Sequence, residues 1–133
     1  MREAMKIEVM KTPLARARGR GASHSGLPHW VIERITAIAL IPLTLWFIYA
    51  TLHLVRADYP TVAHWVAHPV NTVLLLALIA MTFHHMQLGL QVIMEDYIED
   101  TRVRTVSLLA NRGAALVLGL LCAVSVLRLA FTA

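Results

Sequence analysis

The chain has 133 residues and a mass of 14.8 kDa; 58% of the residues are hydrophobic and only 15% are charged. A soluble domain of this size cannot hide that much apolar surface, and an intrinsically disordered chain would be more charged and less apolar. The single cysteine excludes an internal disulfide and any metal site built from several cysteines. The composition therefore places the chain in a lipid bilayer.

Residues 1–26 form a basic tail that is predicted to be flexible until it is bound. They carry six of the twelve Lys and Arg residues and two of the eight acidic residues, which accounts for the whole formal net charge of +4. The remainder, residues 27–133, is balanced in charge and is predicted to be a single membrane domain. The basic excess reads as a topology signal, and nothing in the sequence suggests a nucleic-acid partner.

Three apolar segments are long enough to cross a hydrocarbon core of about 30 Å. We place them at about 31–55, 70–94 and 108–129. Pro42 lies inside the first segment and is expected to kink that helix or to open a local gap in its backbone bonding. The predicted fold class is therefore an all-α membrane protein with three transmembrane helices.

The distribution of basic residues predicts the sidedness of these helices. In addition to the six basic residues of the tail, Arg102 and Arg104 lie in the loop between the second and third spans. The opposite side has Arg56 in its loop and Arg128 near the C-terminus. Because cytoplasmic segments are enriched in Lys and Arg, the N-terminus is expected in the cytoplasm and the C-terminus in the periplasm.

Small residues form a stripe along the third span. Ala115, Gly119 and Ala123 follow one another at intervals of four, so they share one face of a helix. Such a stripe lets another helix approach closely. Packing within the chain and packing against a different subunit explain it equally well.

His85 lies in the middle of the second span. It precedes Asp96 by 11 residues, or about 16 Å of helix, and an ionisable group at that depth is costly. A neutral imidazole there can bond to a neighbouring helix, join a proton path or bind a metal. Haem iron is the metal we favour, because the porphyrin fills apolar space while the imidazole supplies an axial bond. Gly89, one turn away on the same face, leaves room for a macrocycle or for a close helix.

A haem at His85 needs a second axial ligand that this chain does not offer. His84 points about 100° away from His85, and the third span contains no histidine. If His85 binds haem, the second ligand must come from a partner subunit.

Acidic residues and a tyrosine crowd the C-terminal end of the second span: Glu95, Asp96, Tyr97, Glu99 and Asp100. Carboxylates at this end oppose the helix dipole, so local helix stability does not account for them. They can be ordinary solvated groups beside an aromatic anchor. Alternatively, the Tyr97 hydroxyl donates to a quinone carbonyl while Asp96 positions the headgroup or relays protons.

Arg34 marks the end of the first span nearest the tail. It can snorkel and pair locally or with lipid phosphate. A haem propionate would match it equally well, because a guanidinium binds a carboxylate bidentately.

Two groups of residues resemble the small hydrophobic anchor subunit of succinate dehydrogenase, respiratory complex II. The first group is Gly26-Leu27-Pro28-His29-Trp30, Glu33-Arg34-Ile35-Thr36-Ala37 and Pro42-Leu43. The second is His85, Leu88-Gly89-Leu90-Gln91-Val92 and Glu95-Asp96-Tyr97, whose spacing from histidine to the Asp-Tyr pair is fairly specific. The similarity covers about residues 23–131.

The resemblance implies a role for each matching position. His85 takes the place of a haem b axial ligand, and the other ligand is expected on a larger anchor subunit. Arg34 takes the place of the arginine near the haem propionates. Asp96 and Tyr97 take the place of the quinone pair, with ubiquinone favoured over menaquinone. The remaining implied partners are lipid, an iron–sulfur subunit and a flavoprotein subunit that oxidises succinate, a reaction this chain would not perform itself.

The implied location is the bacterial inner membrane rather than the mitochondrial one. Three alternatives stay open at this point. The chain can be a haem-free structural anchor for a soluble enzyme, or the anchor of a related fumarate reductase. It can also belong to a small transporter in which His84 and His85 relay protons.

Overall fold

The computed structural model describes residues 26–132, which fold into four helices. These are α2 (Gly26–Leu54), α3 (Tyr59–Ala67), α4 (Pro69–Tyr97) and α5 (Thr101–Thr132). Three stretches are long and apolar enough to cross a membrane: Leu27–Leu54, Pro69–Tyr97 and Thr101–Thr132. The all-α class and the three spans are therefore confirmed. The tail predicted for residues 1–26 lies, except for Gly26, outside the described residues, and the sidedness stays a prediction.

The long helices extend beyond the predicted spans. α2 begins at Gly26 rather than near residue 31, and α5 begins at Thr101 rather than near residue 108. A helix of 29 residues is about 43 Å long, whereas the hydrocarbon core needs only about 30 Å. The hydropathy pattern marks the part that lipid surrounds, and the helices continue past it.

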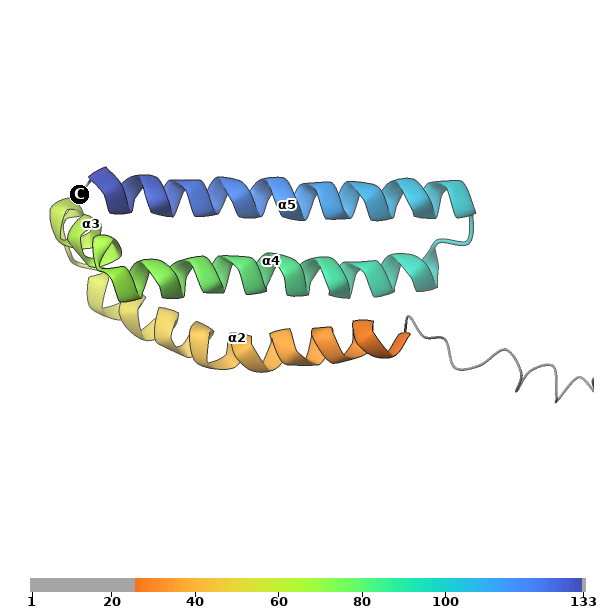
Figure 1. The fold of residues 1–133 in the computed structure, drawn as a ribbon, viewed down its shortest axis with the longest axis horizontal. Coiled ribbons are helices and arrows are strands. Elements are labelled where there is room, and N and C mark those ends of the chain that lie inside the picture. The colour runs from red at the N-terminus through yellow and green to blue at the C-terminus, as the bar shows by residue number, and fades with distance from the viewer. Residues whose placement is uncertain (1–25, 133) are drawn as a thin grey trace, which may run out of the picture.

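The three long helices lie side by side, with α4 between α2 and α5 (Figure 1). α4 packs against both neighbours, and few side chains are buried within the chain. The buried apolar residues are Ala50, Ala63, Val66, Leu75, Leu88 and Ala115. Many large apolar side chains on all three helices are exposed instead, as expected for surfaces that lipid or other subunits cover.

The short helix α3, at the end of the layer where α2 meets α4, was not predicted (Figure 1). Asp58 caps its N-terminus by accepting a hydrogen bond from the backbone N–H of Thr61 at 3.3 Å, and Pro60 occupies its first turn. Trp65 stacks on Trp46 of α2, with ring centroids 5.7 Å apart. The sequence Asp58-Tyr59-Pro60 carries the start signal for this helix.

The structure answers the question left open by the small-residue stripe. A Cβ placed on Gly119 would meet the Phe83 side chain of α4 at 3.5 Å, and Ala115 is buried. These two residues of the stripe therefore face α4 of the same chain. Pro42 lies within α2, which bows along its length but continues to Leu54 without a break (Figure 1).

Candidate functional site

His85 contacts α2 through one hydrogen bond. Its Nδ1 atom lies 3.0 Å from the hydroxyl oxygen of Thr36. Thr36 is buried, with 4% of its surface exposed, and His85 is half-buried. Thr36 follows the start of α2 by about 15 Å and His85 precedes the end of α4 by about 18 Å. Because the two helices run antiparallel, these residues meet at the same depth.

The other ring nitrogen of His85, Nε2, remains available. It makes no hydrogen bond to any residue that the structure describes, and it is not a fully buried atom. Beside it on the same helical face, a Cβ added to Gly89 would meet nothing within 4 Å. A close helix of this chain therefore does not explain Gly89, and the space next to it is open. An imidazole with a free nitrogen beside open space fits an axial ligand of haem.

A metal site made of side chains alone is not assembled in residues 26–132. No group of three or more His, Cys, Asp or Glu side chains comes together there. A haem differs from such a site, because the macrocycle supplies four iron ligands and the protein supplies only axial ones. One imidazole from this chain is therefore compatible with haem.

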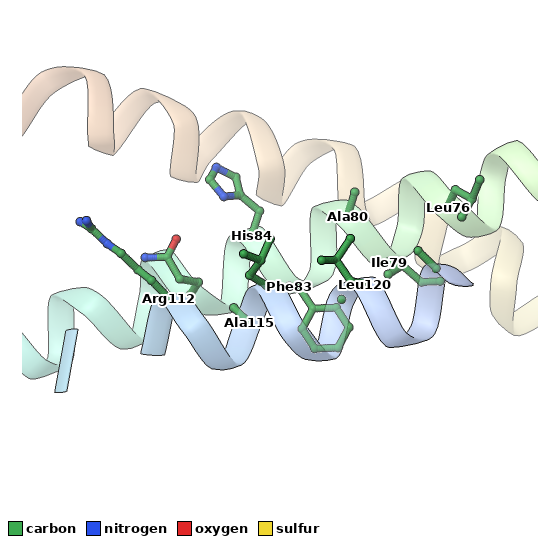
Figure 2. A pocket seen from close by; sticks show the side chains of 12 residues that line it. Leu76, Ile79, Ala80, Phe83, His84, Arg112, Ala115 and Leu120 are labelled. Carbon is green, nitrogen blue, oxygen red and sulfur yellow. The ribbon is translucent and has the colours of Figure 1, made fainter. Parts of the chain in front are cut away.

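His84 faces a different part of the molecule. It lines an apolar groove of about 540 Å³ between α4 and α5, together with Phe83, Ala115 and Arg112 (Figure 2). His85, Arg34, Gly89, Asp96 and Tyr97 are not among the lining residues. His84 lines this groove whereas His85 bonds to Thr36 of α2, and no hydrogen bond joins the two imidazoles within residues 26–132.

A strip of polar side chains runs from the groove between α4 and α5 to the C-terminal end of α4: Gln87, Gln91, Glu95, Asn111 and Arg112. Gln87 Nε2 donates to Gln91 Oε1 at 3.1 Å, and Gln91 Nε2 donates to Glu95 Oε1 at 2.8 Å. Asn111 of α5 is buried and donates to the backbone carbonyl of Gln87 at 2.9 Å. Arg112 completes the strip with a long contact to Gln91 at 3.5 Å. These bonds satisfy polar groups at membrane depth and tie α5 to α4.

Two carboxylates of the acidic cluster have structural roles, contrary to the expectation that local stability does not account for them. Glu95 accepts the bond from Gln91. Asp100 lies beyond the end of α4 and caps α5, accepting from the backbone N–H groups of Arg102 at 2.8 Å and Val103 at 2.9 Å. α4 ends at Tyr97, so Glu99 and Asp100 lie beyond its last turn rather than within it, contrary to the expectation that all four carboxylates share one helix end.

Asp96 and Tyr97 have no such explanation. Both are exposed, Tyr97 to 82%, and neither side chain forms a hydrogen bond with another residue in the part of the chain that the structure describes. They stand at the end of α4, on the side of the molecule where α2 begins (Figure 1). Their polar groups are therefore available to a ligand or a partner.

Arg34 lies on α2 two residues before Thr36, which places it on roughly the opposite face of that helix. Its guanidinium lies over the Trp30 ring, 4.8 Å from the centroid, and its side chain is exposed. The structure therefore does not bring Arg34 to His85, and its role toward a propionate stays a prediction.

Sequence reasoning missed Thr36 and Asn111 as site-forming residues. The signal was present in both cases: each is a polar residue within an apolar span. Matching their depths to polar groups on the antiparallel neighbour, His85 for Thr36 and Gln87 for Asn111, would have found both pairs.

Residues 8–127 match the profile of the succinate dehydrogenase/fumarate reductase transmembrane subunit family. The chain belongs to this family. It is 33% identical to the succinate dehydrogenase hydrophobic membrane anchor subunit of Rickettsia bellii (strain RML369-C). The alignment spans 100 residues, which are 75% of this chain and 80% of the relative. The corresponding subunit of Rickettsia conorii (strain ATCC VR-613 / Malish 7) is 34% identical over 95 residues, 71% of this chain and 75% of the relative.

The succinate dehydrogenase membrane anchor subunit of Reclinomonas americana is also similar, with 27% identity over 95 residues, 69% of this chain and 79% of the relative. No solved structure matches the chain significantly. The resemblance of residues 23–131 to a complex II membrane anchor is thus confirmed, and family membership agrees with the three apolar helices.

Proposed function

We propose that this chain is the small membrane anchor subunit of a succinate:quinone oxidoreductase. With a larger anchor subunit it holds the iron–sulfur and flavoprotein subunits at the bacterial inner membrane, its N-terminus in the cytoplasm. The curated relatives described above are named as succinate dehydrogenase anchors, which favours succinate oxidation over fumarate reduction. The exposed apolar faces of the helix layer support assembly with partner helices and lipid.

The chain would share one haem b with the larger anchor subunit, and His85 would supply this chain's ligand to the iron. The free Nε2 of His85 beside the open space at Gly89 is the observation that carries this proposal. Bound haem supplies a one-electron carrier between the iron–sulfur subunit and quinone. The chain's own contribution is to hold the imidazole at mid-membrane depth and to leave its second face open to the partner.

Asp96 and Tyr97 form this chain's part of a quinone site, ubiquinone being favoured. The Tyr97 hydroxyl donates a hydrogen bond to a quinone carbonyl, and the Asp96 carboxylate orients the headgroup or passes protons from water. Their exposure, and the absence of hydrogen bonds to other residues of the helix layer, support this role. Arg34 is assigned, on the resemblance, to a haem propionate.

His85→Ala tests the haem assignment, with His84→Ala as the matched control. In the purified complex, we expect His85→Ala to lose or alter the b-type absorption spectrum, because the iron loses an axial bond. His84→Ala removes the adjacent imidazole of the same helix, which lines the groove between α4 and α5. The spectrum of this variant should therefore be that of the native complex. An unchanged spectrum in His85→Ala would falsify the assignment and leave the chain as a haem-free structural anchor.

A further inference from the structure

The Thr36 hydroxyl stands at the centre of a three-way contact. Its oxygen lies 2.9 Å from the backbone carbonyl of Ile32, 2.9 Å from that of Glu33 and 3.0 Å from His85 Nδ1. The two carbonyls belong to the preceding turn of the same helix, where a threonine hydroxyl commonly donates its proton. The imidazole belongs to a different helix, so the contact fixes α2 against α4.

Counting protons gives the direction of the bond to histidine. A hydroxyl has one proton and two acceptor lone pairs. We assign the hydroxyl proton to the two carbonyls, which can only accept, as is usual for a threonine within a helix. Toward Nδ1 the hydroxyl then offers a lone pair, and in this assignment Nδ1 carries the hydrogen. In a neutral imidazole this leaves the lone pair on Nε2, the nitrogen that has no partner among the described residues.

The geometry of Thr36 suits a fixed support. Threonine is branched at Cβ and has few side-chain rotamers in a helix, and only 4% of this residue is exposed. Burial keeps lipid headgroups and water from competing for the hydroxyl. The bond to Nδ1 therefore sets both the tautomer and the orientation of the His85 ring.

We propose that Thr36 is a positioning residue for the haem ligand: by accepting the Nδ1 hydrogen of His85 it aims Nε2 at the iron and sets the haem reduction potential. This inference rests on the haem ligation proposed above. An imidazole that donates its second N–H to an oxygen is a more basic ligand, and a more basic ligand stabilises ferric iron. Thr36 therefore lowers the potential.

Three variants of the intact complex test this role. Thr36→Val keeps the shape of the side chain and removes the hydroxyl, whereas Thr36→Ser keeps the hydroxyl. Thr51→Val is the matched control, because Thr51 lies on the same helix and its hydroxyl bonds, among the described residues, only to the Phe47 carbonyl, at 2.7 Å. The readouts are a redox titration of the haem and the electron paramagnetic resonance spectrum of its ferric form.

For Thr36→Val we expect the ferrous-to-ferric ratio at a given applied potential to rise about tenfold, which is an upward shift of about 59 mV for one electron. The ferric resonance should also broaden, because the ring is no longer fixed. Thr36→Ser and Thr51→Val should match the native complex. Loss of haem from the valine variant alone would equally support the role, since that variant lacks only the hydroxyl.

Two results would overturn the inference. A native potential and spectrum in Thr36→Val would show that the hydroxyl does not act on the haem, and equal shifts in the valine and serine variants would show that the hydroxyl is not responsible. Failure of the haem assignment itself is separately visible: an unchanged b-type spectrum in His85→Ala removes both proposals, whatever the Thr36 variants do.

Discussion

Polar side chains in the apolar helices of this chain find partners on the neighbouring helix. Thr36 reaches His85 between α2 and α4, and Asn111 reaches the Gln87 carbonyl between α5 and α4. In lipid no water competes for such groups, so each bond both satisfies a polar atom and selects one rotation of the helix. These residues fix which faces of α4 meet α2 and α5.

Asn111→Ala should loosen the contact between α4 and α5. We expect the free energy of unfolding to fall by about 0.6 to 1.7 kcal/mol, the range for a hydrogen bond between membrane helices. The Gln87 carbonyl keeps its own helical bond, so no orphaned acceptor adds to the loss. Titration of the detergent-solubilised complex with dodecyl sulfate measures the change.

Ser125→Ala is the control for this measurement. In the part of the chain that the structure describes, the Ser125 hydroxyl bonds only to the Leu121 carbonyl of its own helix, at 2.8 Å. Equal stability losses in the two variants would contradict a specific role for the bond between helices.

At the scale of elements, capping explains where the helices begin. Asp58 starts α3 and Asp100 starts α5, each accepting a hydrogen bond from a backbone N–H of the first turn. α3 in turn contacts the ends of two long helices. The Trp65 ring stacks on Trp46 of α2, and the Trp65 backbone carbonyl accepts a hydrogen bond from the side-chain amide of Asn71 of α4 at 2.8 Å. A short capped helix thus closes one end of the layer.

The cap of α3 should make its stability depend on pH. The hydrogen bonds from the Thr61 side chain and backbone N–H lower the pKa of Asp58 below its ordinary value of 3.8. Because the folded pKa lies below the unfolded one, the stabilisation is present above pH 3.8 and is lost as the pH falls through the lowered value. We expect the near-ultraviolet circular dichroism of the Trp46–Trp65 pair to weaken in that range.

Asp58→Asn separates this effect from other titrations. Asparagine also caps a helix but has no charge to lose, so its signal should stay constant over the same acid range. A titration in Asp58→Asn identical to that of the native chain would mean that another group controls α3.

At the scale of the whole molecule, the three long helices form a layer that buries few side chains of its own (Figure 1). A closed bundle would cover its functional groups, whereas a layer presents them to partners. His85 keeps a free nitrogen on one side of α4, and Asp96 and Tyr97 stand exposed at the end of the same helix. We therefore expect both proposed sites to be completed by other subunits.

Tyr97→Phe tests the quinone site in the assembled enzyme. We expect quinone reduction to fall about tenfold, as for the loss of one hydrogen bond to a substrate, because the variant lacks only the hydroxyl. Succinate oxidation with an artificial soluble acceptor should be unchanged, since Tyr97 is 82% exposed and supports no other residue in the described layer.

Tyr59→Phe provides the matched control. Tyr59 is 73% exposed but is the first residue of α3, at the opposite end of the layer from Tyr97 (Figure 1), so both activities should remain native. If Tyr97→Phe lowers both activities equally, the tyrosine serves assembly rather than quinone.

Much of the fold could be predicted because membrane insertion depends on composition over some twenty residues. The apolar segments gave the number and approximate place of the spans, and the helices extend beyond them at their ends. α3 was missed because its signal is a cap and a proline rather than a long apolar run. The depth of His85 followed from helical rise alone.

The sequence by itself determined the number of apolar spans and the resemblance of the spacing from His85 to Asp96 and Tyr97 to an anchor of complex II, and it predicted a mid-depth position for His85. Only the tertiary structure decided which helix His85 meets, that Thr36 bonds its Nδ1, and that Ala115 and Gly119 of the small-residue stripe face α4. The physical reason is that hydropathy fixes the depth of a residue but not the rotation of its helix, which is set by bonds and contacts between helices.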